Sequence, residues 1–230
     1  MMIRFSWPVL LAGALLALSC QKDPARELPE PEKPVVLDGS HKGPAAVFIG
    51  DSITWNWDRE GVGHPTFFQS NSYVGKGISG DTTTGMLNRF QKDVIDLDPY
   101  CVVIEGGTND IGNDKIKLAD ILERIKKMAE IARKANIDVI IGSVPPSNSY
   151  PKIPGFQPED KIIELNGMIK SWAAAEGIPY ADYYSVLVDD AKGLKKAYQR
   201  DSIHPNAAGY TAMEGVIQPI LKKVLSNHTK

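Results

Sequence analysis

The chain has 230 residues and a formal net charge of −2, so it carries no excess of basic residues for a nucleic-acid surface. We therefore expect no nucleic-acid partner. Its two cysteines, Cys20 and Cys101, are too few for a disulfide framework. Cys101 lies in the apolar run Tyr100–Ile104, where we expect a buried filler rather than a nucleophile.

Residues 1–19 are typical of an export signal. Arg4 gives a positive start, and the apolar run Phe5–Leu18 is too short to span a bilayer comfortably. The segment Leu16-Ala17-Leu18-Ser19-Cys20 resembles a bacterial lipobox, which implies cleavage before Cys20 and lipid on that cysteine. A plain secretory signal is the alternative. We predict a lipoprotein of the bacterial envelope, on its periplasmic or cell-surface face, that contacts the membrane through this anchor only.

Residues 20–44 follow as a predicted tether. Prolines alternate with charged residues here, at Pro24, Pro29, Pro31, Pro34 and Pro44. Such a composition favours an extended, solvated chain that would hold the rest of the protein away from the membrane. The rest has the length of one α/β domain, and we predict a single domain over residues 45–226.

Short, continuous apolar runs in this domain predict strands that are covered on both faces. They lie at Ala45–Ile49, Tyr73–Val74, Cys101–Ile104, Val139–Ile141 and Pro179–Tyr183. Between them, apolar residues recur every three or four positions and predict helices over 87–97, 118–132, 162–172 and 210–224. The alternation predicts a three-layer α/β/α sandwich around a mainly parallel sheet of about five strands, with active residues on loops at the strands' carboxyl ends.

Four loops in this scheme carry polar residues. Gly50-Asp51-Ser52-Ile53-Thr54 follows the first strand, Gly77–Thr82 the second and Gly106–Asp110 the third, and Asp201-Ser202-Ile203-His204-Pro205 precedes the last helix. A serine hydroxyl is a weak nucleophile until a base takes its proton, and a histidine base needs a partner that fixes its tautomer. The first and last of these loops supply all three groups.

These four segments, in this order, resemble those of the SGNH or GDSL-type hydrolases, and the resemblance covers almost the whole predicted domain. It implies a flavodoxin-like fold and an ester hydrolase with Ser52 as nucleophile, His204 as general base and Asp201 as the group that orients the base. It also implies an oxyanion hole made of the backbone N–H groups of Ser52 and Gly80 and the side-chain amide of Asn109. No cofactor is expected.

Each of these residues also has a structural interpretation. Ser52 can cap the helix that follows, and Asp201 can begin one. Gly80 and Asn109 are residue types that favour turns, and His204 can be a surface-loop histidine. The catalytic interpretation rests on their different chemical types, which a single acyl-transfer site needs together.

The other histidines are less suited to catalysis. His41 falls in the predicted tether and His228 lies near the end of the chain. His64 lies in a loop and is the one rival base, but it has no Asp at a triad-like spacing, although Asp58 is near. We predict that His64 lines the substrate pocket.

Two further patterns suggest other chemistry. Gly75-Lys76-Gly77-Ile78-Ser79-Gly80 matches a dinucleotide-binding G-x-G-x-x-G, but Asp96 and Asp98, the acidic residues that follow, precede the next strand instead of ending it. An oxyanion glycine explains the run better. The sequence has no H-E-x-x-H, no paired C-x-x-C and no G-x-S-x-G, so we expect neither a metal nor the α/β-hydrolase family.

The sequence indicates the class of reaction more clearly than it indicates the substrate. Trp55 and Trp57 follow Ser52 closely and can stack on a sugar ring, line an acyl pocket or pack in the core. The proline-rich stretch 144–158 is long enough to overhang the site. We predict a small-molecule or glycan ester as substrate, with O-acetyl esters of carbohydrates first. Lysophospholipids, short-chain esters and thioesters are alternatives, and a non-catalytic carbohydrate-binding module is an alternative of another class.

Overall fold

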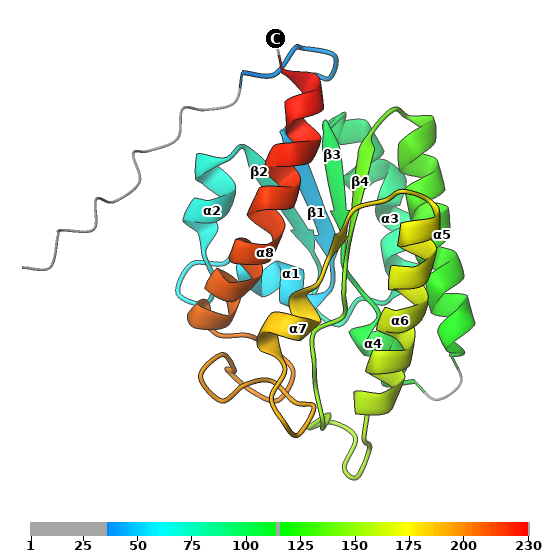
Figure 1. Ribbon diagram of the computed structural model, residues 1–230, viewed down its shortest axis with the longest axis vertical. Helices are drawn as coiled ribbons and strands as arrows, with labels where there is room; N and C mark the ends of the chain where they lie inside the picture. The colour runs from blue at the N-terminus through cyan, green and yellow to red at the C-terminus, as the bar shows by residue number, and fades with distance from the viewer. Residues whose placement is uncertain (1–35, 114–115, 230) are drawn as a thin grey trace, which may run out of the picture. The chain divides into compact units, whose positions relative to one another are not determined.

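A parallel five-stranded sheet forms the middle layer of the computed structural model, which describes residues 36–113 and 116–229 (Figure 1). In spatial order its strands are β2 (Tyr73–Gly77), β1 (Ala46–Gly50), β3 (Cys101–Ile104), β4 (Asp138–Gly142) and β5 (Tyr180–Ala181). Every residue of β1 and β3 is buried, including Cys101, because helices cover both faces of these central strands. The predicted sandwich is confirmed.

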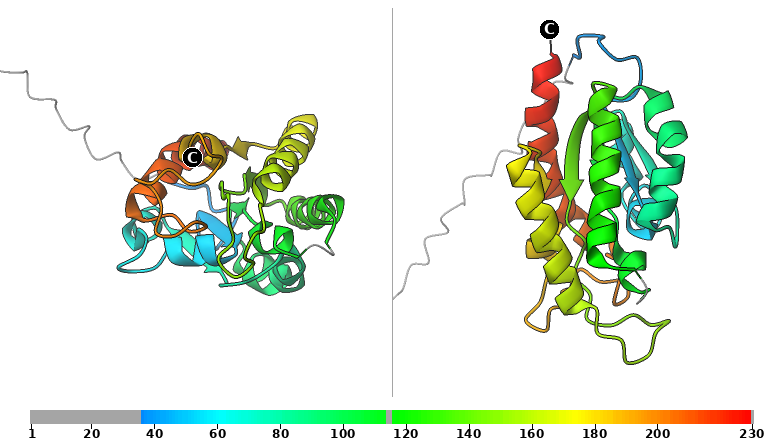
Figure 2. Two further views of the ribbon diagram at one scale, coloured as in Figure 1. Left: turned by 90° about the horizontal axis from the view of Figure 1, so that it is seen from below. Right: turned by 90° about the vertical axis from the view of Figure 1, so that its right-hand side faces the viewer.

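Two groups of helices pack on opposite faces of the sheet, as the views in Figure 2 show. Alternate residues of β1 point to opposite faces, so Val47 and Ile49 belong to one core and Ala46 and Phe48 to the other. The first core is covered by α3 (Thr83–Asp93), α5 (Leu118–Lys134) and α6 (Glu159–Ala175). The second is covered by α1 (Ser52–Trp57), α2 (Pro65–Ser70), α7 (Tyr183–Leu187) and α8 (Ala207–Leu225).

The helix predicted over 87–97 ends earlier than its apolar pattern suggests. α3 ends at Asp93, and a separate turn of 3-10 helix covers Ile95–Leu97. Asp98 then takes a left-handed conformation with φ 49°, directly before Pro99. A residue before proline is disfavoured in the helical region, so the chain leaves the helix here and turns into β3.

The predicted tether is corrected at its carboxyl end, because residues 36–44 pack against the domain. The buried His41 ring lies with Nδ1 2.7 Å from Asp98 Oδ1 and Nε2 3.2 Å from the carbonyl oxygen of Asn136. Leu37 forms an antiparallel bridge with Thr229, beyond the predicted domain end at residue 226. These contacts depend on individual residues such as His41 and Leu37, and the proline and charge content of the segment does not predict them. The predicted signal peptide and Cys20 lie outside the described residues.

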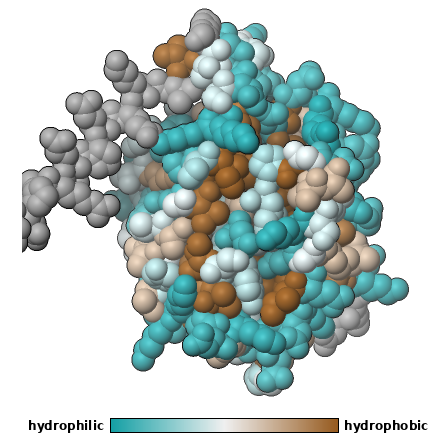
Figure 3. Space-filling model, viewed as in Figure 1, coloured by the Kyte–Doolittle hydropathy of each residue, from teal (hydrophilic) through white to brown (hydrophobic). Residues whose placement is uncertain are grey.

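Among the described residues, no helix is both long and apolar enough to cross a membrane. On the face of the molecule drawn in Figure 3, hydrophobic patches are interrupted by hydrophilic side chains.

A short helix, α4 (Thr108–Ile111), follows β3 at the carboxyl edge of the sheet. The loops after β1, β2 and β3 meet at this edge because parallel strands share their direction.

Candidate active site

Ser52 is the first residue of α1 and follows the buried strand β1 directly. Asp51, and not Ser52, caps this helix: its Oδ1 accepts the N–H of Ile53 at 2.8 Å. The helix is also tied to α8, because the Tyr210 hydroxyl donates to the carbonyl oxygen of Ile53 at 2.9 Å. Since Asp51 does the capping, the Ser52 hydroxyl is left free for another partner.

That partner is His204. Its Nε2 lies 2.9 Å from Ser52 Oγ, although the two residues are separated by 152 positions in the sequence. On the other side of the ring, Nδ1 lies 2.9 Å from Oδ1 and 2.8 Å from Oδ2 of Asp201. A proton on Nδ1 facing this carboxylate leaves Nε2 as the acceptor for the serine hydroxyl. The structure thus brings together the three groups of the predicted triad.

Asp201 is held in place by the backbone of its own loop. Its Oδ1 accepts the N–H groups of Ile203 at 2.9 Å and His204 at 2.8 Å. Partial burial raises the pKa of Asp201, but these backbone hydrogen bonds and the His204 ring outweigh it and hold the pKa below its ordinary value. The carboxylate is therefore ionised where the imidazole needs it.

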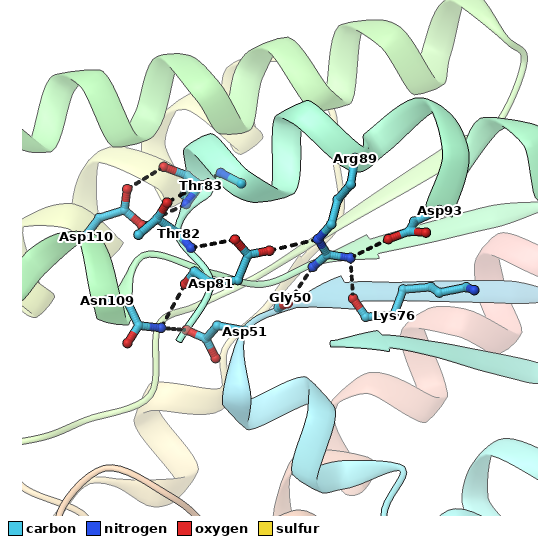
Figure 4. A network of polar contacts seen from close by, with 11 residues as sticks. Gly50, Asp51, Lys76, Asp81, Thr82, Thr83, Arg89, Asp93, Asn109 and Asp110 are labelled. Carbon is cyan, nitrogen blue, oxygen red and sulfur yellow. Dashed lines mark hydrogen bonds and ion pairs between the residues drawn. The ribbon is translucent and has the colours of Figure 1, made fainter. Parts of the chain in front are cut away.

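The three predicted oxyanion residues, Ser52, Gly80 and Asn109, line one pocket with His204. Gly80 has φ +80°, a conformation typical of a turn glycine that also leaves its backbone open to the pocket. Asn109, on α4, donates from Nδ2 to the carbonyl oxygen of Asp81 at 2.8 Å, and the same nitrogen lies 3.4 Å from Asp51 Oδ2 (Figure 4). The turn interpretation and the site interpretation of Gly80 are thus compatible.

The pocket has a volume of about 580 Å³ and combines polar and apolar walls. Four residues of the stretch 144–158 contribute to it, namely Tyr150, Pro151, Lys152 and Ile153. Tyr150 is fixed there because its hydroxyl donates to the carbonyl oxygen of Thr108 at 3.0 Å. The remaining lining comes from Ser52, Ser79, Gly80, Thr108, Asn109, Gly112, Asp201, Ile203 and His204. The proline-rich stretch therefore forms a wall of the pocket.

The predicted pocket residues Trp55, Trp57 and His64 do not line it. Trp57 is 2% exposed in the second core, while Trp55 is 40% exposed and packs under Arg59, whose Cζ lies 4.3 Å from its ring centre. His64 Nδ1 lies 2.9 Å from Glu214 Oε1, which also accepts the indole N–H of Trp57 at 3.0 Å. Trp57, five positions after Ser52, projects from another side of the short helix, whereas Trp55, three positions after Ser52, packs against Arg59 instead of the pocket. Proximity along the chain can be read from the sequence, whereas the direction of these side chains depends on tertiary packing.

Two further carboxyl groups, those of Asp51 and Glu105, are buried near Ser52, and neither was predicted as part of the site. Burial, together with the nearby charges of Asp110 and Asp81, raises the pKa of Asp51 to about 7. Burial and the charge of Asp51 raise the pKa of Glu105 well above its ordinary value. No hydrogen-bond partner among the described residues reaches either carboxyl oxygen of Glu105. The available signal was their position, because Glu105 directly follows the predicted strand Cys101–Ile104 and Asp51 follows the predicted strand Ala45–Ile49 after one glycine.

Comparison with known proteins agrees with this architecture. Residues 48–212 match the model of the GDSL-like Lipase/Acylhydrolase family. A GDSL-like lipase from Bacteroides thetaiotaomicron is 38% identical with a TM-score of 0.74, covering 77% of this chain and 87% of that chain. Esterase TesA of Pseudomonas aeruginosa is 27% identical over 154 residues, 66% of this chain and 70% of that protein. The N-acylneuraminate cytidylyltransferase of Escherichia coli is 33% identical over 127 residues, 53% of this chain but only 28% of that protein's length.

Proposed function

Because the chain belongs to the GDSL-like lipase/acylhydrolase family, a family of ester-bond hydrolases, we propose that it cleaves acyl esters through an acyl-enzyme on Ser52. The observation that carries the proposal is the hydrogen-bonded series from Ser52 Oγ through the His204 ring to the Asp201 carboxylate. This series gives a serine hydroxyl the adjacent base that it needs in order to attack a carbonyl carbon.

The reaction proceeds in two halves. Ser52 Oγ attacks the ester carbonyl while His204 Nε2 takes the hydroxyl proton, and Asp201 stabilises the resulting imidazolium. The tetrahedral oxyanion lies against the backbone N–H groups of Ser52 and Gly80 and the amide of Asn109. Collapse breaks the bond to the alcohol, which leaves with the proton from His204. Water activated by the same base then hydrolyses the acyl-serine.

We propose a short acyl ester as the substrate, with O-acetyl esters of carbohydrates as the first class to test. The tryptophans no longer support a sugar, because both lie outside the pocket. The support comes instead from the pocket lining, to which Ser79, Lys152 and Asn109 contribute polar groups and Tyr150 an aromatic ring. Polar groups of this kind can hydrogen-bond sugar hydroxyls while the ring packs on an apolar face.

The test is a rate comparison across p-nitrophenyl esters of graded acyl length, acetylated sugars and lysophospholipids, with Ser52→Ala as the control. We expect Ser52-dependent hydrolysis, with kcat/KM highest for acetyl and falling as the chain lengthens. A maximum at long acyl chains or at lysophospholipids would replace the short-chain proposal but keep the esterase. Equal rates for the wild type and Ser52→Ala would refute the nucleophile.

We also propose that Cys20 carries a lipid that anchors the exported protein to the envelope. The proposal is supported by the lipobox-like segment Leu16–Cys20. Wild-type protein expressed in a bacterial host should partition into a detergent phase and incorporate labelled fatty acid, whereas Cys20→Ala should do neither. Secretion of an unlipidated wild-type protein would support a plain secretory signal instead.

A further inference from the structure

Arg89 lies on α3, outside the pocket, and its side chain is only 14% exposed. Its guanidinium donates Nε to the Asp81 carboxylate at 2.7 Å and Nη1 to the Asp93 carboxylate at 2.8 Å. It also donates to two backbone carbonyls, Lys76 from Nη1 and Gly50 from Nη2, each at 2.8 Å (Figure 4). These contacts use all three nitrogens at the edges of the planar guanidinium, an arrangement that the ammonium of a lysine cannot reproduce.

Two of these acceptors belong to the turns that carry the proposed oxyanion donors. Gly50 ends β1 two positions before Ser52, and its carbonyl oxygen accepts both Arg89 and the N–H of Ile78 at 3.1 Å. Asp81 directly follows Gly80 in the sequence. One guanidinium therefore joins the turn that bears the Ser52 N–H to the turn that bears the Gly80 N–H.

The third donor depends on the same network. The Asn109 amide donates to the carbonyl oxygen of Asp81 at 2.8 Å, so the position of Asp81 determines where Asn109 points. The Asp81 carboxylate is itself confined, since its Oδ1 accepts the N–H of Thr82 at 2.9 Å. Gly85 leaves room for it: a Cβ on Gly85 would collide with Asp81 Oδ1. Asp81 thus has one well-defined place, between Arg89 and the first turn of α3.

We propose that Arg89 is a positioning residue that sets the spacing of the three oxyanion donors by tying Gly50 to Asp81. The inference rests on the proposed function of Ser52. Oxyanion donors must lie about 2.7–3.1 Å from the developing charge, and a displacement of about 1 Å in a catalytic arrangement costs roughly 10² in rate. Arg89 touches no substrate, and its effect is on geometry alone.

Loss of Arg89 should weaken stabilisation of the transition state and leave substrate binding nearly unchanged. In Arg89→Met, kcat for an acetyl ester should fall roughly 10²-fold while KM changes little, because the oxyanion exists only in the transition state. Hydrolysis of the matching thiono ester, in which sulfur replaces the carbonyl oxygen, should fall much less, since sulfur accepts hydrogen bonds weakly. The ratio of ester to thiono-ester rates should therefore drop.

Three further variants make the test sharper. Arg89→Lys keeps a positive charge near Asp81 but cannot reach both backbone carbonyls, so it should be intermediate. Gly85→Ala keeps Arg89 and displaces the Asp81 carboxylate, so it should show the same drop in the rate ratio. Asp93→Asn is the matched control, because it weakens one Arg89 contact that holds no oxyanion segment, and its kinetics should stay near wild type.

Circular dichroism and thermal melting of each variant separate folding from positioning. The inference is overturned if folded Arg89→Met or Gly85→Ala keeps the wild-type kcat, or if ester and thiono-ester rates fall equally. Should Arg89→Met not fold, Arg89→Lys and Gly85→Ala decide by the same ratio. Failure of the proposed function looks different, because wild-type protein would then show no Ser52-dependent hydrolysis at all.

Discussion

Asp201 combines two tasks in one carboxylate. It accepts two backbone N–H groups of its own loop, from Ile203 and His204, and it faces Nδ1 of the His204 ring. The first task fixes the loop that presents the ring, and the second fixes the tautomer of the ring. An amide can perform the first task but performs the second poorly, because its NH₂ group would stand where Oδ2 faces Nδ1 and cannot accept a hydrogen bond there.

Asp201→Asn should therefore keep the fold and lose most of the activity. We expect kcat to fall by about 10³ to 10⁴, because the amide favours the tautomer with its proton on Nε2, which cannot act as base. The melting temperature should stay close to wild type, since the asparagine oxygen can still accept the loop N–H groups. Steady-state kinetics and a melting curve check both expectations, and near-normal turnover would refute the assigned role.

Glu105 is buried directly after β3, and this has a consequence for stability. Burial raises its pKa in the native state, so the native protein keeps this proton at pH values where the unfolded chain has released it. The native state then binds more protons than the unfolded state, and stability falls as pH rises above the ordinary pKa of about 4.5. Below that pH both states are protonated and the effect disappears.

Glu105→Gln should remove this penalty. The variant should gain stability over wild type at about pH 8 and differ little at about pH 4, as measured by chemical denaturation at both values. Glu130→Gln is the matched control, since Lys134 and Lys127 hold the pKa of the exposed Glu130 at about 2, and its neutralisation should have no stabilising effect. A variant less stable than wild type at the higher pH would contradict the account.

At the scale of elements, the central strands and the long helices could be predicted from the sequence, whereas the short helices could not. The run Cys101–Ile104 is uniformly apolar because β3 is buried on both faces, so its bounds match the prediction. The helices α2, α4 and α7 have six residues or fewer, which is too short to show a helical period. Tertiary contacts hold them, such as the Ser143 hydroxyl, which accepts the N–H of Tyr184 in α7 at 2.8 Å.

Glu214 of α8 shows how one contact holds such short helices. Its Oε1 accepts from Trp57 at the end of α1 and lies against Nδ1 of His64, which precedes α2. A polar group left unpaired in a buried place costs about 1–3 kcal/mol. Two of the three residues predicted for the substrate pocket, Trp57 and His64, are therefore assigned to the packing of helices.

Glu214→Ala should lower the free energy of unfolding by about 1–3 kcal/mol in urea and leave kcat/KM for an acetyl ester within about threefold of wild type. His64→Ala should behave similarly but more mildly. Glu164→Ala, at an exposed position on α6, is the control and should change neither quantity. A tenfold loss of kcat/KM in folded Glu214→Ala or His64→Ala would return these residues to the site.

At the scale of the whole molecule, the site is assembled from loops that lie far apart in the sequence. The parallel sheet places the carboxyl ends of β1, β2 and β3 side by side. The loop residues that follow these strands could therefore be assigned to one edge of the sheet from the sequence alone. The pocket wall could not be assigned in this way. Which of Trp55, Tyr150 and Ile153 faces Ser52 depends on side-chain direction and on the path of a long loop.

The most direct test of this account is stoichiometric reaction with a fluorophosphonate, which modifies an activated serine, followed by peptide mass spectrometry. We predict one label per molecule, located on Ser52, in the wild-type protein. Ser52→Ala should take up none, and His204→Ala should react far more slowly with its fold intact. Folded wild-type protein that stays unlabelled, or that carries the label on another serine, would contradict the central claim.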